Sequence, residues 1–189
     1  VRIPDLEYEH VTRLLDTGCQ SLIVPHVKTG EEVRRFIEMA KYHPEGKRGV
    51  AIYLGANTDY EDVDSVQAMT HANANTLLGV LIETQEAVEN MDDILIPGID
   101  VALVGTQDLA HSMGFPGEFD RPELRQALGR VRTLCKKRGI ATAGALTKPE
   151  QVQAVIDTGA QYILYGTDLV LLRQAALQAA QALAPFRKK

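Results

Sequence analysis

Cysteine is scarce in this chain, and its two cysteines, Cys19 and Cys135, stand far apart in the sequence. Isolated cysteines are typical of free thiols in a reducing compartment rather than of a disulfide framework. Long apolar runs are missing too, since none approaches the roughly 20 residues that a membrane-spanning helix needs. We therefore expect a cytoplasmic protein with no membrane association.

Clustered basic charge is also lacking, apart from Arg187, Lys188 and Lys189 at the end of the chain. The net charge is -5 at pH 7, whereas proteins that bind nucleic acid present a basic face to its phosphates. We therefore expect no nucleic acid partner, and we interpret the short basic tail as a solvated end.

The length of the chain suits one domain. Its 189 residues, 45% of them hydrophobic, supply one substantial core and too little material for two. We expect a single domain over residues 1–189. The chain opens on Val1 rather than on Met, directly in an extended-looking segment that stops at Pro4. We also expect that an N-terminal part of the natural protein precedes Val1.

Short apolar strands alternate with amphipathic helices, with one strand and one helix in about every 25 to 35 residues. Asp120 and Asp168 are candidate caps for the helices that follow them. Residues 49–54 fit either a strand or an extended loop. The expected strands are residues 1–3, 21–27, 76–82, 101–105, 141–146 and 162–165, and the expected helices are residues 8–17, 31–41, 61–73, 85–95, 121–137, 149–158 and 169–184.

This order of elements favours a parallel α/β fold. Six consecutive strand–helix units fit a (β/α)8 TIM barrel that lacks two units. An open, doubly wound sheet would more often carry a glycine-rich phosphate loop after its first strand, and the sequence has no such loop. We therefore expect a partial TIM barrel.

Two acids follow adjacent expected strands. Glu83 comes directly after Leu81 and Ile82, and Asp108 follows the run from Val101 to Val104 by a short turn. Because the carboxyl ends of parallel strands meet at one rim, these carboxylates are candidate ligands for a hard cation such as Mg²⁺ or Mn²⁺. The alternative is that each acid simply begins a helix, where the partial positive charge favours it.

Other polar residues belong to the same expected rim. Arg2 ends the first expected strand, and its guanidinium could hold a carboxylate or polarise a keto oxygen; alternatively it is a surface arginine at a ragged end. The turn at Gly105, Thr106 and Gln107 precedes a helix, so its backbone amides, with that of Asp108, could receive an anion. Such turns are common.

Three further residues allow more than one interpretation. Lys28 lies in a polar turn, which disfavours the desolvated lysine that a Schiff base requires. His26 could reach the rim, although a histidine in such a place more often has only a structural role in packing and hydrogen bonding. Asp16, in the motif RLLDTG, is interpreted as a helix-end residue on the opposite rim or at an interface.

A series of short motifs extends from Val1 to the terminal helix. They are VRIP at residues 1–4, LLDTG at 14–18, VPHVKTGEEV at 24–33, KYHPEGKRGV at 41–50, LIETQEAVENMDDIL at 81–95, GIDVALVGTQDLAHSMG at 98–114 and GTDLVLL at 166–172. Together and in this order they resemble the HpcH/HpaI aldolase family.

The resemblance implies a (β/α)8 barrel that begins here at its third strand, with residues 49–54 in a long loop after the fourth strand. It implies a metal-dependent, class II pyruvate aldolase, which converts 2-oxo-3-deoxy or 4-hydroxy-2-oxo acids into pyruvate and an aldehyde. It also implies a homo-oligomer, a trimer of dimers or hexamer, in which the terminal helix, about residues 169–184, swaps between subunits.

The resemblance also assigns residues. Glu83 and Asp108 match the two ligands of a divalent metal, Mg²⁺ or Mn²⁺, with Co²⁺ as a further candidate. Arg2 matches the arginine that contacts the 2-oxo acid. The backbone amides around Thr106, Gln107 and Asp108 match those that hold the carboxylate of that acid.

Asp16 matches an acid that supports the family's catalytic histidine, and that histidine belongs to a segment that this sequence does not contain. The sequence also departs from the family at the rim. Leu81 replaces a glutamine near the metal waters, and the turn at Gly105, Thr106 and Gln107 replaces Gly-Pro followed by a small or polar residue. Either change could alter substrate or rate, and neither touches the metal ligands.

Two alternatives to an aldolase stay open. One is a relative that uses the same metal enolate for another carbon–carbon reaction, as a siderophore-type citrate synthase or a citrate lyase β-like protein does. The other is a degenerate, non-catalytic barrel kept for assembly or ligand binding. The absent N-terminal units and Leu81 prompt this second alternative.

Overall fold

The computed structural model describes residues 1–52 and 55–186. Contacts within the chain divide it into two compact units, residues 1–142 and residues from 143 onward. Within the described residues, no helix combines the length and apolarity needed to cross a bilayer. The strands are β1 (Ser21–Val24), β2 (Leu77–Ile82), β3 (Val101–Val104), β4 (Ala141–Leu146) and β5 (Tyr162–Tyr165).

Helices lie between all of these strands. The α-helices are α1 (Tyr8–Asp16), α2 (Gly30–Ala40), α3 (Ser65–Asn75), α4 (Gln85–Glu89), α5 (Met91–Ile94), α6 (Thr106–Ser112), α7 (Pro122–Arg138), α8 (Val152–Asp157) and α9 (Asp168–Leu183), and the 3-10 helices are η1 (Ala56–Thr58), η2 (Pro149–Gln151) and η3 (Ala184–Phe186).

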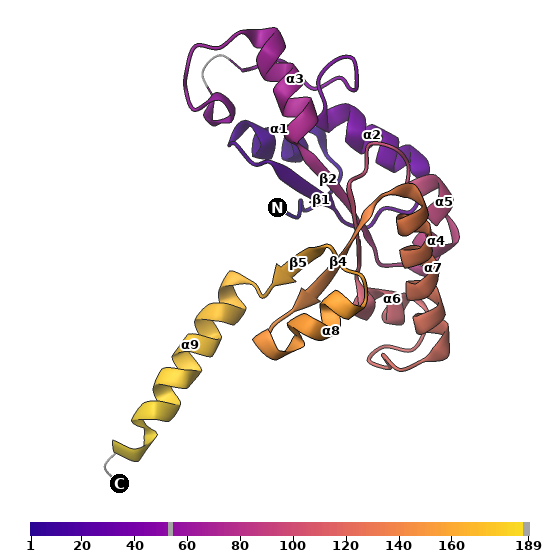
Figure 1. Ribbon diagram of the computed structural model, residues 1–189, viewed down its shortest axis with the longest axis vertical. Coiled ribbons are helices and arrows are strands. Elements are labelled where there is room, and N and C mark those ends of the chain that lie inside the picture. The colour runs from indigo at the N-terminus through magenta and orange to yellow at the C-terminus, as the bar shows by residue number, and fades with distance from the viewer. Residues whose placement is uncertain (53–54, 187–189) are drawn as a thin grey trace. The chain divides into compact units, whose positions relative to one another are not determined.

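The first unit is organised around the parallel strands β1, β2 and β3 (Figure 1). β1 pairs with β2 in a register that begins with Ser21 beside Leu77, and β2 pairs with β3 in a register that begins with Gly79 beside Val101. All three strands are mainly apolar, as expected for strands buried on both faces. Their carboxyl ends therefore lie at one edge of the sheet.

Residues 1–3 extend beside β1, but they form an isolated parallel bridge between Arg2 and Ile23 rather than a full strand. The Ile3 N–H donates to the Ile23 carbonyl at 3.0 Å, and the Val1 carbonyl accepts the Ile23 N–H at 2.8 Å. Ile23 also pairs with Gly79 of β2, so Arg2, Ile23 and Gly79 lie in one row across the sheet.

β1 ends at Val24, three residues earlier than the sequence predicts. Pro25 has no N–H to donate to a neighbouring strand. His26 has a φ of 58°, in the left-handed region that strands do not use. The chain therefore turns out of the sheet after Val24 and leaves His26 at the carboxyl end of the strand.

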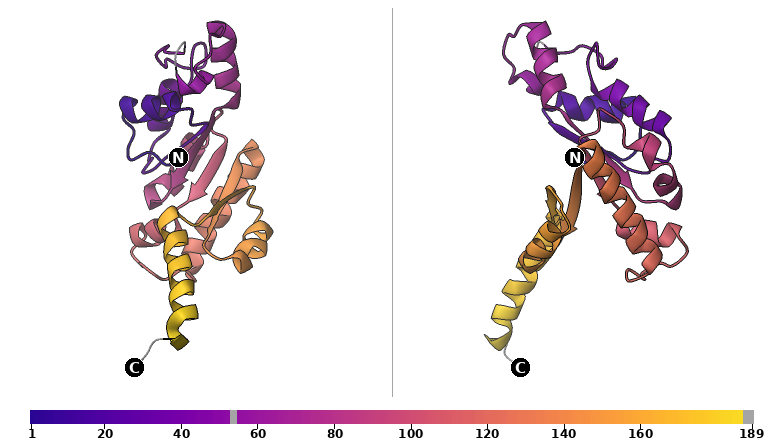
Figure 2. Two further views of the ribbon diagram at one scale, coloured as in Figure 1. Left: turned by 90° about the vertical axis from the view of Figure 1, so that its left-hand side faces the viewer. Right: turned by 45° about the vertical axis from the view of Figure 1, so that its right-hand side comes forward.

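Helices α2, α4, α5 and α7 of the first unit bury apolar residues against one side of these strands. In Figure 1 and in the right-hand view of Figure 2, α2, α4, α5 and α7 lie on the same side of the sheet. Successive side chains of a strand point to opposite faces of the sheet, so every second side chain faces this core. The core includes Ile3, Leu22, Val24, Val33, Phe36, Leu78, Val80, Ile82, Val88, Ile94, Ala102, Leu124 and Val131.

Several expected helix boundaries are corrected by local hydrogen bonds. The helix expected over residues 85–95 is divided into α4 and α5, because Asn90 (φ -92°, ψ 9°) leaves helical geometry and its side chain donates to the Lys28 carbonyl at 2.8 Å. α3 begins later than expected, since the carboxylate of Asp64 caps it by accepting the Gln67 N–H at 2.8 Å. The helix expected over residues 149–158 is η2 followed by α8.

Two expected caps are wrong by one residue. α7 begins after Arg121, which makes no side-chain cap, while the carboxylate of Asp120 pairs with Arg125 at 2.7 Å. α9 is capped by the hydroxyl of Thr167, and Asp168 is the first residue of the helix. Residues 49–52 form neither helix nor strand, and Tyr53 and Leu54, the rest of that expected element, lie outside the described residues.

The second unit contains most of β4, which pairs in parallel with β5 from Ala143 to Leu146. α8 lies between these strands in the chain, and the Val155 side chain occupies the space that a side chain at Gly144 would need. None of the residues of α9 is buried, and Leu169 and Leu172 are 73% and 69% exposed.

The strand pairing follows the order β1-β2-β3-β4-β5, and every pairing is parallel. Parallel neighbours in chain order, joined by helices, are the repeating arrangement of a (β/α) barrel. The predicted α/β class is therefore confirmed, and the described residues carry a part of such a barrel rather than all eight strands. The single domain predicted over residues 1–189 stays a prediction.

A buried lysine joins α2 to α3 in the first unit. Lys41 is 6% exposed, and its ammonium donates to the carbonyls of Asn73 at 2.5 Å and Thr76 at 2.8 Å. These carbonyls lie at the end of α3, where the last C=O groups of a helix have no N–H donors within the helix. Burial lowers the pKa of Lys41, and the negative charges of Asp100 and Glu45 partly oppose that shift.

Replacing this lysine should destabilise the fold. We expect Lys41→Met to lower the free energy of unfolding by about 2 kcal/mol, because two buried carbonyls lose their donor. The lowered pKa means that the unfolded chain binds the Lys41 proton more tightly than the folded chain does. The wild type should therefore gain stability relative to Lys41→Met as the pH rises through the lowered pKa towards the ordinary lysine value.

Urea unfolding of both proteins at several pH values measures this difference. Lys47→Met is the matched control, because Lys47 is 78% exposed and pairs with Glu38 at the surface. Equal effects of the two substitutions would contradict a specific role for the buried ammonium.

Candidate metal and substrate site

Glu83 lies one residue beyond the carboxyl end of β2, and only 2% of its side chain is exposed. Its Oε1 accepts the backbone N–H of His26 at 2.7 Å and lies 2.8 Å from Nδ1 of the same residue. Its Oε2 is buried and has no hydrogen-bond partner among the residues that the structure describes. Since a buried carboxylate oxygen without a partner is costly, Oε2 is the atom at which a cation would be most favourable.

Gly105 brings the second carboxylate next to the first. Its N–H donates to the Ile82 carbonyl at 3.0 Å, which continues the pairing of β2 and β3 to the level of Glu83. A Cβ at Gly105 would lie 2.9 Å from Cβ and 3.2 Å from Oε2 of Glu83, and 3.6 Å from Oδ2 of Asp108. The missing side chain of Gly105 therefore leaves a small space that is bordered by oxygens of both acids.

This donor set fits a hard divalent cation. Mg²⁺ and Mn²⁺ are commonly held by one or two carboxylates, with waters and substrate oxygens completing the coordination. In the part of the chain that the structure describes, no group of three or more His, Cys, Asp or Glu side chains could hold a metal. Glu83 and Asp108 would thus leave most positions on the cation open to water and substrate.

The turn after β3 leads directly into α6. Gly105 is the N-cap residue of this helix and provides no side-chain cap, and Thr106, Gln107 and Asp108 form its first turn. α6 has seven residues. The structure thus brings Asp108 to Glu83, while the predicted contact of these amides with a substrate carboxylate stays a prediction.

Arg2 is exposed and lies on the sheet face that does not carry the helices. Side chains alternate along a strand, so Gly79, Leu81 and Glu83 share one face of β2, opposite to the core residues between them. Arg2 stands in the row of Gly79 through its bridge to Ile23. Arg2 therefore lies on the same sheet face as Glu83. Its row, that of Gly79, is four residues before Glu83 along β2.

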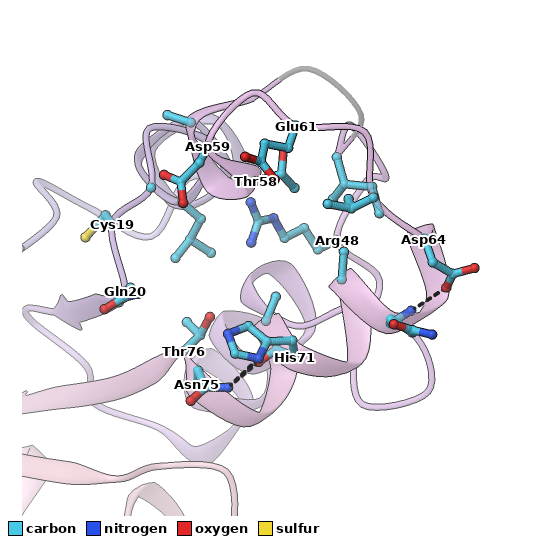
Figure 3. Close-up of a pocket in the computed structure, with 18 residues that line it drawn as sticks. Cys19, Gln20, Arg48, Thr58, Asp59, Glu61, Asp64, His71, Asn75 and Thr76 are labelled. Carbon is cyan, nitrogen blue, oxygen red and sulfur yellow. Dashed lines mark hydrogen bonds between the residues drawn. The ribbon is translucent and has the colours of Figure 1, made fainter.

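Asp16 lies at the other end of the strands. It ends α1, and its Oδ1 accepts from the guanidinium of Arg48 at 2.7 Å. Arg48 has a side chain that is 3% exposed, and Figure 3 shows it pointing into a pocket of about 680 Å³. Gln20 and Thr76, which precede β1 and β2, line this pocket. Within one chain Asp16 is therefore not brought to the two carboxylates, and its predicted role stays a prediction.

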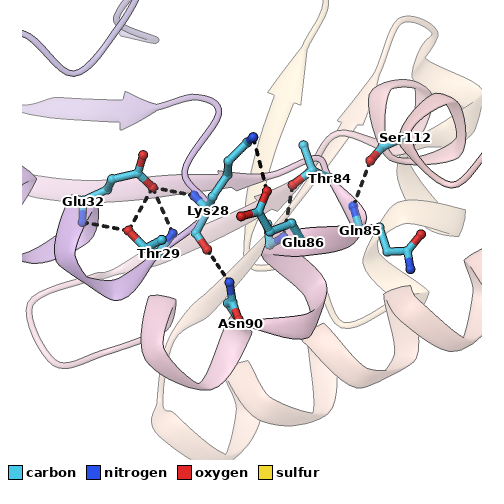
Figure 4. Close-up of polar contacts among 9 residues, drawn as sticks. Lys28, Thr29, Glu32, Thr84, Gln85, Glu86, Asn90 and Ser112 are labelled. Atoms are coloured by element: carbon cyan, nitrogen blue, oxygen red, sulfur yellow. Dashed lines mark hydrogen bonds and ion pairs between the residues drawn. The ribbon is translucent and has the colours of Figure 1, made fainter.

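The loops around Glu83 are tied to each other. Figure 4 shows the Lys28 side chain paired with Glu86 at 3.2 Å and its carbonyl bound to Asn90. In the same figure the N–H of Gln85 donates to the hydroxyl of Ser112, at 3.0 Å, which joins the start of α4 to the end of α6. Lys28 is half-exposed and paired, so its surroundings do not favour a Schiff base.

The sequence did not predict two of these contacts. His26 was weighed as a residue that could reach the rim, but nothing in the pattern indicated that it would bind Glu83 through both backbone and ring. The partner of Asp16, Arg48, comes from a segment without regular secondary structure. Such contacts depend on backbone turns for which hydrophobic periodicity carries no signal.

Comparison with known proteins identifies the family. The family model described as HpcH/HpaI aldolase/citrate lyase matches residues 1–175. A hydroxypyruvate/pyruvate aldolase from Roseovarius nubinhibens is 32% identical over 183 residues, which cover 94% of this chain and 69% of that protein. A 2-keto-3-deoxy-L-rhamnonate aldolase from Salmonella paratyphi B is 30% identical over 166 residues, which cover 87% of this chain and 61% of that protein.

A solved structure gives the same result. The HpcH/HpaI aldolase from Desulfitobacterium hafniense DCB-2 superimposes with a TM-score of 0.87 at 28% sequence identity, covering 97% of this chain and 71% of that chain. The predicted family and enzyme class are thereby confirmed. The chain belongs to the HpcH/HpaI aldolase/citrate lyase family, and it is by class a carbon–carbon lyase.

Proposed function

We propose that this chain is a divalent-metal-dependent pyruvate aldolase, which cleaves or forms a 4-hydroxy-2-oxo acid with pyruvate and an aldehyde as partners. One observation carries the proposal. The buried Oε2 of Glu83 has no hydrogen-bond partner among the described residues, and both Oε2 and Oδ2 of Asp108 border the space left by Gly105. The relatives named hydroxypyruvate/pyruvate aldolase support pyruvate as the 2-oxo acid.

The chain's own residues divide the work at this site. Glu83 and Asp108 would hold Mg²⁺, Mn²⁺ or Co²⁺. When bound, the cation would supply Lewis-acid stabilisation of the negative charge that develops on a 2-oxo acid. Arg2, on the same sheet face, would bind the keto oxygen or the carboxylate, and the amides from Thr106 to Asp108 would hold that carboxylate.

Aldol cleavage also needs a base for the C4 hydroxyl of the substrate. The resemblance assigns this task to a histidine that is not among these 189 residues, with Asp16 as its support. Since Asp16 and Glu83 lie at opposite ends of the strands in one chain, Asp16 would serve a site on another subunit. We therefore propose that Asp16 acts across a subunit interface.

We further propose a homo-oligomer in which α9 packs against a second copy of this chain. α9 has 16 residues and none is buried, and several of its leucines are exposed to solvent. Exposed apolar side chains gathered on one element are a mark of an interface. The trimer of dimers and the exchange of α9 between subunits belong to this proposal.

Metal removal tests the proposed function. We expect the methyl protons of pyruvate to exchange with D2O in the presence of the protein and Mg²⁺, as followed by proton NMR. The exchange should stop in EDTA and return when Mg²⁺ is restored in excess. Exchange that is equally fast in EDTA would contradict the proposal. Consumption of acetyl-CoA and oxaloacetate, with no pyruvate exchange, would favour a citrate synthase-like reaction instead.

A substitution of Arg2 tests its proposed contact with the substrate. We expect Arg2→Ala to raise the KM for the 2-oxo acid by roughly 10- to 100-fold, because a charge-assisted hydrogen bond to substrate is lost. The Kd for Mn²⁺ should not change, since Arg2 is not a ligand. Steady-state kinetics and Mn²⁺ titration measure both quantities.

Arg13→Ala is the matched control, because Arg13 is exposed in the last turn of α1 and has no place in the site. Equal kinetics of the two variants would remove Arg2 from the proposed site.

A further inference from the structure

His26 binds Glu83 in an unusual way. Its backbone N–H donates to Oε1 of Glu83 at 2.7 Å, and its ring Nδ1 lies 2.8 Å from the same oxygen. The ring itself is 71% exposed, whereas Glu83 is 2% exposed. The N–H and the ring Nδ1 of His26 therefore both lie at one oxygen of a buried carboxylate, and within the described residues the other oxygen, Oε2, has no hydrogen-bond partner.

The backbone of His26 makes this double contact geometrically available. His26 has a φ of 58°, which non-glycine residues rarely adopt, although histidine, asparagine and aspartate do so more often than most. A residue held in such a conformation is kept there by its surroundings and is often found at a functional site. The turn aims both the N–H and the ring of His26 at the end of β2.

The loop that carries His26 is fixed on its far side. The N–H groups of Lys28 and Thr29 donate to Oε2 of Glu32 at 2.7 and 2.9 Å, and the Lys28 carbonyl accepts from Asn90 at 2.8 Å (Figure 4). These bonds hold the segment after β1 at both α2 and the break between α4 and α5. The loop from which His26 contacts Glu83 is therefore held in place by hydrogen bonds to α2 and to Asn90.

We propose that His26 is a positioning residue for Glu83, which makes this glutamate present Oε2 alone to a cation shared with Asp108. This inference rests on the cation site of the proposed function. The N–H bond to Oε1 and the Nδ1 atom 2.8 Å from the same oxygen restrict the carboxylate, which otherwise rotates easily about its last torsion. Oε2 then faces the space beside Gly105, which Oδ2 of Asp108 also borders.

The ring contributes separately from the backbone. A substitution of His26 keeps the N–H bond to Oε1 and removes only the contact of Nδ1 with that oxygen. With one bond left, the carboxylate can turn and offer either oxygen, so the ligand is less well oriented before the metal arrives. Hydrogen-bond partners of metal ligands commonly change metal affinity by about 10- to 100-fold when they are removed.

Two variants of His26 separate the role of the donor from the role of the backbone. His26→Gly keeps the positive φ without strain and has no side chain. His26→Asn also tolerates the left-handed region, and its amide nitrogen occupies nearly the position of Nδ1, since both are attached to Cγ. His26→Asn is therefore expected to restore what His26→Gly loses.

The experiment measures the Kd for Mn²⁺ alone, by EPR titration of the full chain at fixed pH, for the wild type, both His26 variants and Glu83→Gln. We expect Glu83→Gln to lose the site, His26→Gly to weaken binding by roughly 10- to 100-fold, and His26→Asn to stay within about threefold of the wild type. Thermal unfolding without metal shows whether each variant is folded.

The outcomes separate this inference from the proposed function. Mn²⁺ binding that is equal in the wild type and in Glu83→Gln would overturn the cation site and the role of His26 with it. Loss of binding in Glu83→Gln, with His26→Gly equal to the wild type, would overturn only the role of His26. Equal weakening in both folded His26 variants would also overturn it, because the donor would then have no part in the effect.

Discussion

Glu83→Gln should lower the rate of metal-dependent proton exchange at the pyruvate methyl group by about a thousandfold or more. Glutamine has the same shape, and its amide oxygen can still accept from His26, but the amide nitrogen would then replace Oε2. An NH2 group cannot hold a cation, and several kcal/mol of Lewis-acid stabilisation would be lost. Asp108→Asn should have an effect of similar size.

The same variant should not lose stability in the absence of metal. Oε2 of Glu83 is a buried carboxylate oxygen without a partner among the described residues, so neutralising this carboxylate should leave the melting temperature of the metal-free protein equal or raised. Glu86→Gln is the matched control. Glu86 lies only three residues after Glu83, but its side chain is exposed and pairs with Lys28. Normal exchange rates in both Glu83→Gln and Asp108→Asn would refute their assignment as metal ligands.

Gly105→Ala should be the most damaging single-methyl change at the site. Its φ of -75° suits alanine, so the backbone is not strained. The added Cβ would lie 2.9 Å from Cβ of Glu83 and 3.2 Å from Oε2, distances at which one of the groups must move. We expect Mn²⁺ affinity and pyruvate exchange each to fall by about 10- to 100-fold, because the two carboxylates would be pushed apart.

A second glycine provides the comparison for this substitution. Gly129 lies within α7, and a Cβ there would meet no atom within 4 Å. Gly129→Ala should therefore raise stability by up to about 1 kcal/mol, through helix propensity, and leave Mn²⁺ binding unchanged. Wild-type Mn²⁺ affinity in Gly105→Ala would show that the space beside this glycine is not where the cation binds.

The part of the site that could be predicted from the sequence is the part that follows from strand direction. Glu83 and Asp108 each come after an apolar run, and parallel strands bring such positions to one edge. The structure places both carboxylates around Gly105, as this argument requires. The identity of the metal and of the substrate does not follow from strand geometry, which is why both are proposals.

Contacts made by turns could not be predicted in this way. The bond from His26 to Glu83 depends on a positive φ directly after Pro25, and no hydrophobic pattern signals that conformation. The division of the expected helix at residues 85–95 depends on Asn90, whose side chain reaches Lys28 some 62 residues earlier in the chain. Both features arise from tertiary contacts that override local preference.

The first and last residues of the helices and strands were predicted less well than the helices and strands themselves. The caps of α7 and α9 differ by one residue from those expected, because Thr167 takes the capping position before Asp168, and Asp120 pairs with Arg125 instead of capping. These shifts do not move the strands. The carboxyl ends of β2 and β3, which carry the site, lie within one residue of their expected positions.

The proposed function requires that Glu83 and Asp108 form a divalent-cation site in this chain. Anomalous diffraction from crystals soaked with Mn²⁺ tests it most directly, since the metal is located independently of any assay. We expect one strong peak per chain, within coordination distance of Oε2 of Glu83 and Oδ2 of Asp108, and no such peak in crystals of Glu83→Gln. A strong peak elsewhere, with none between these two carboxylates, would contradict it.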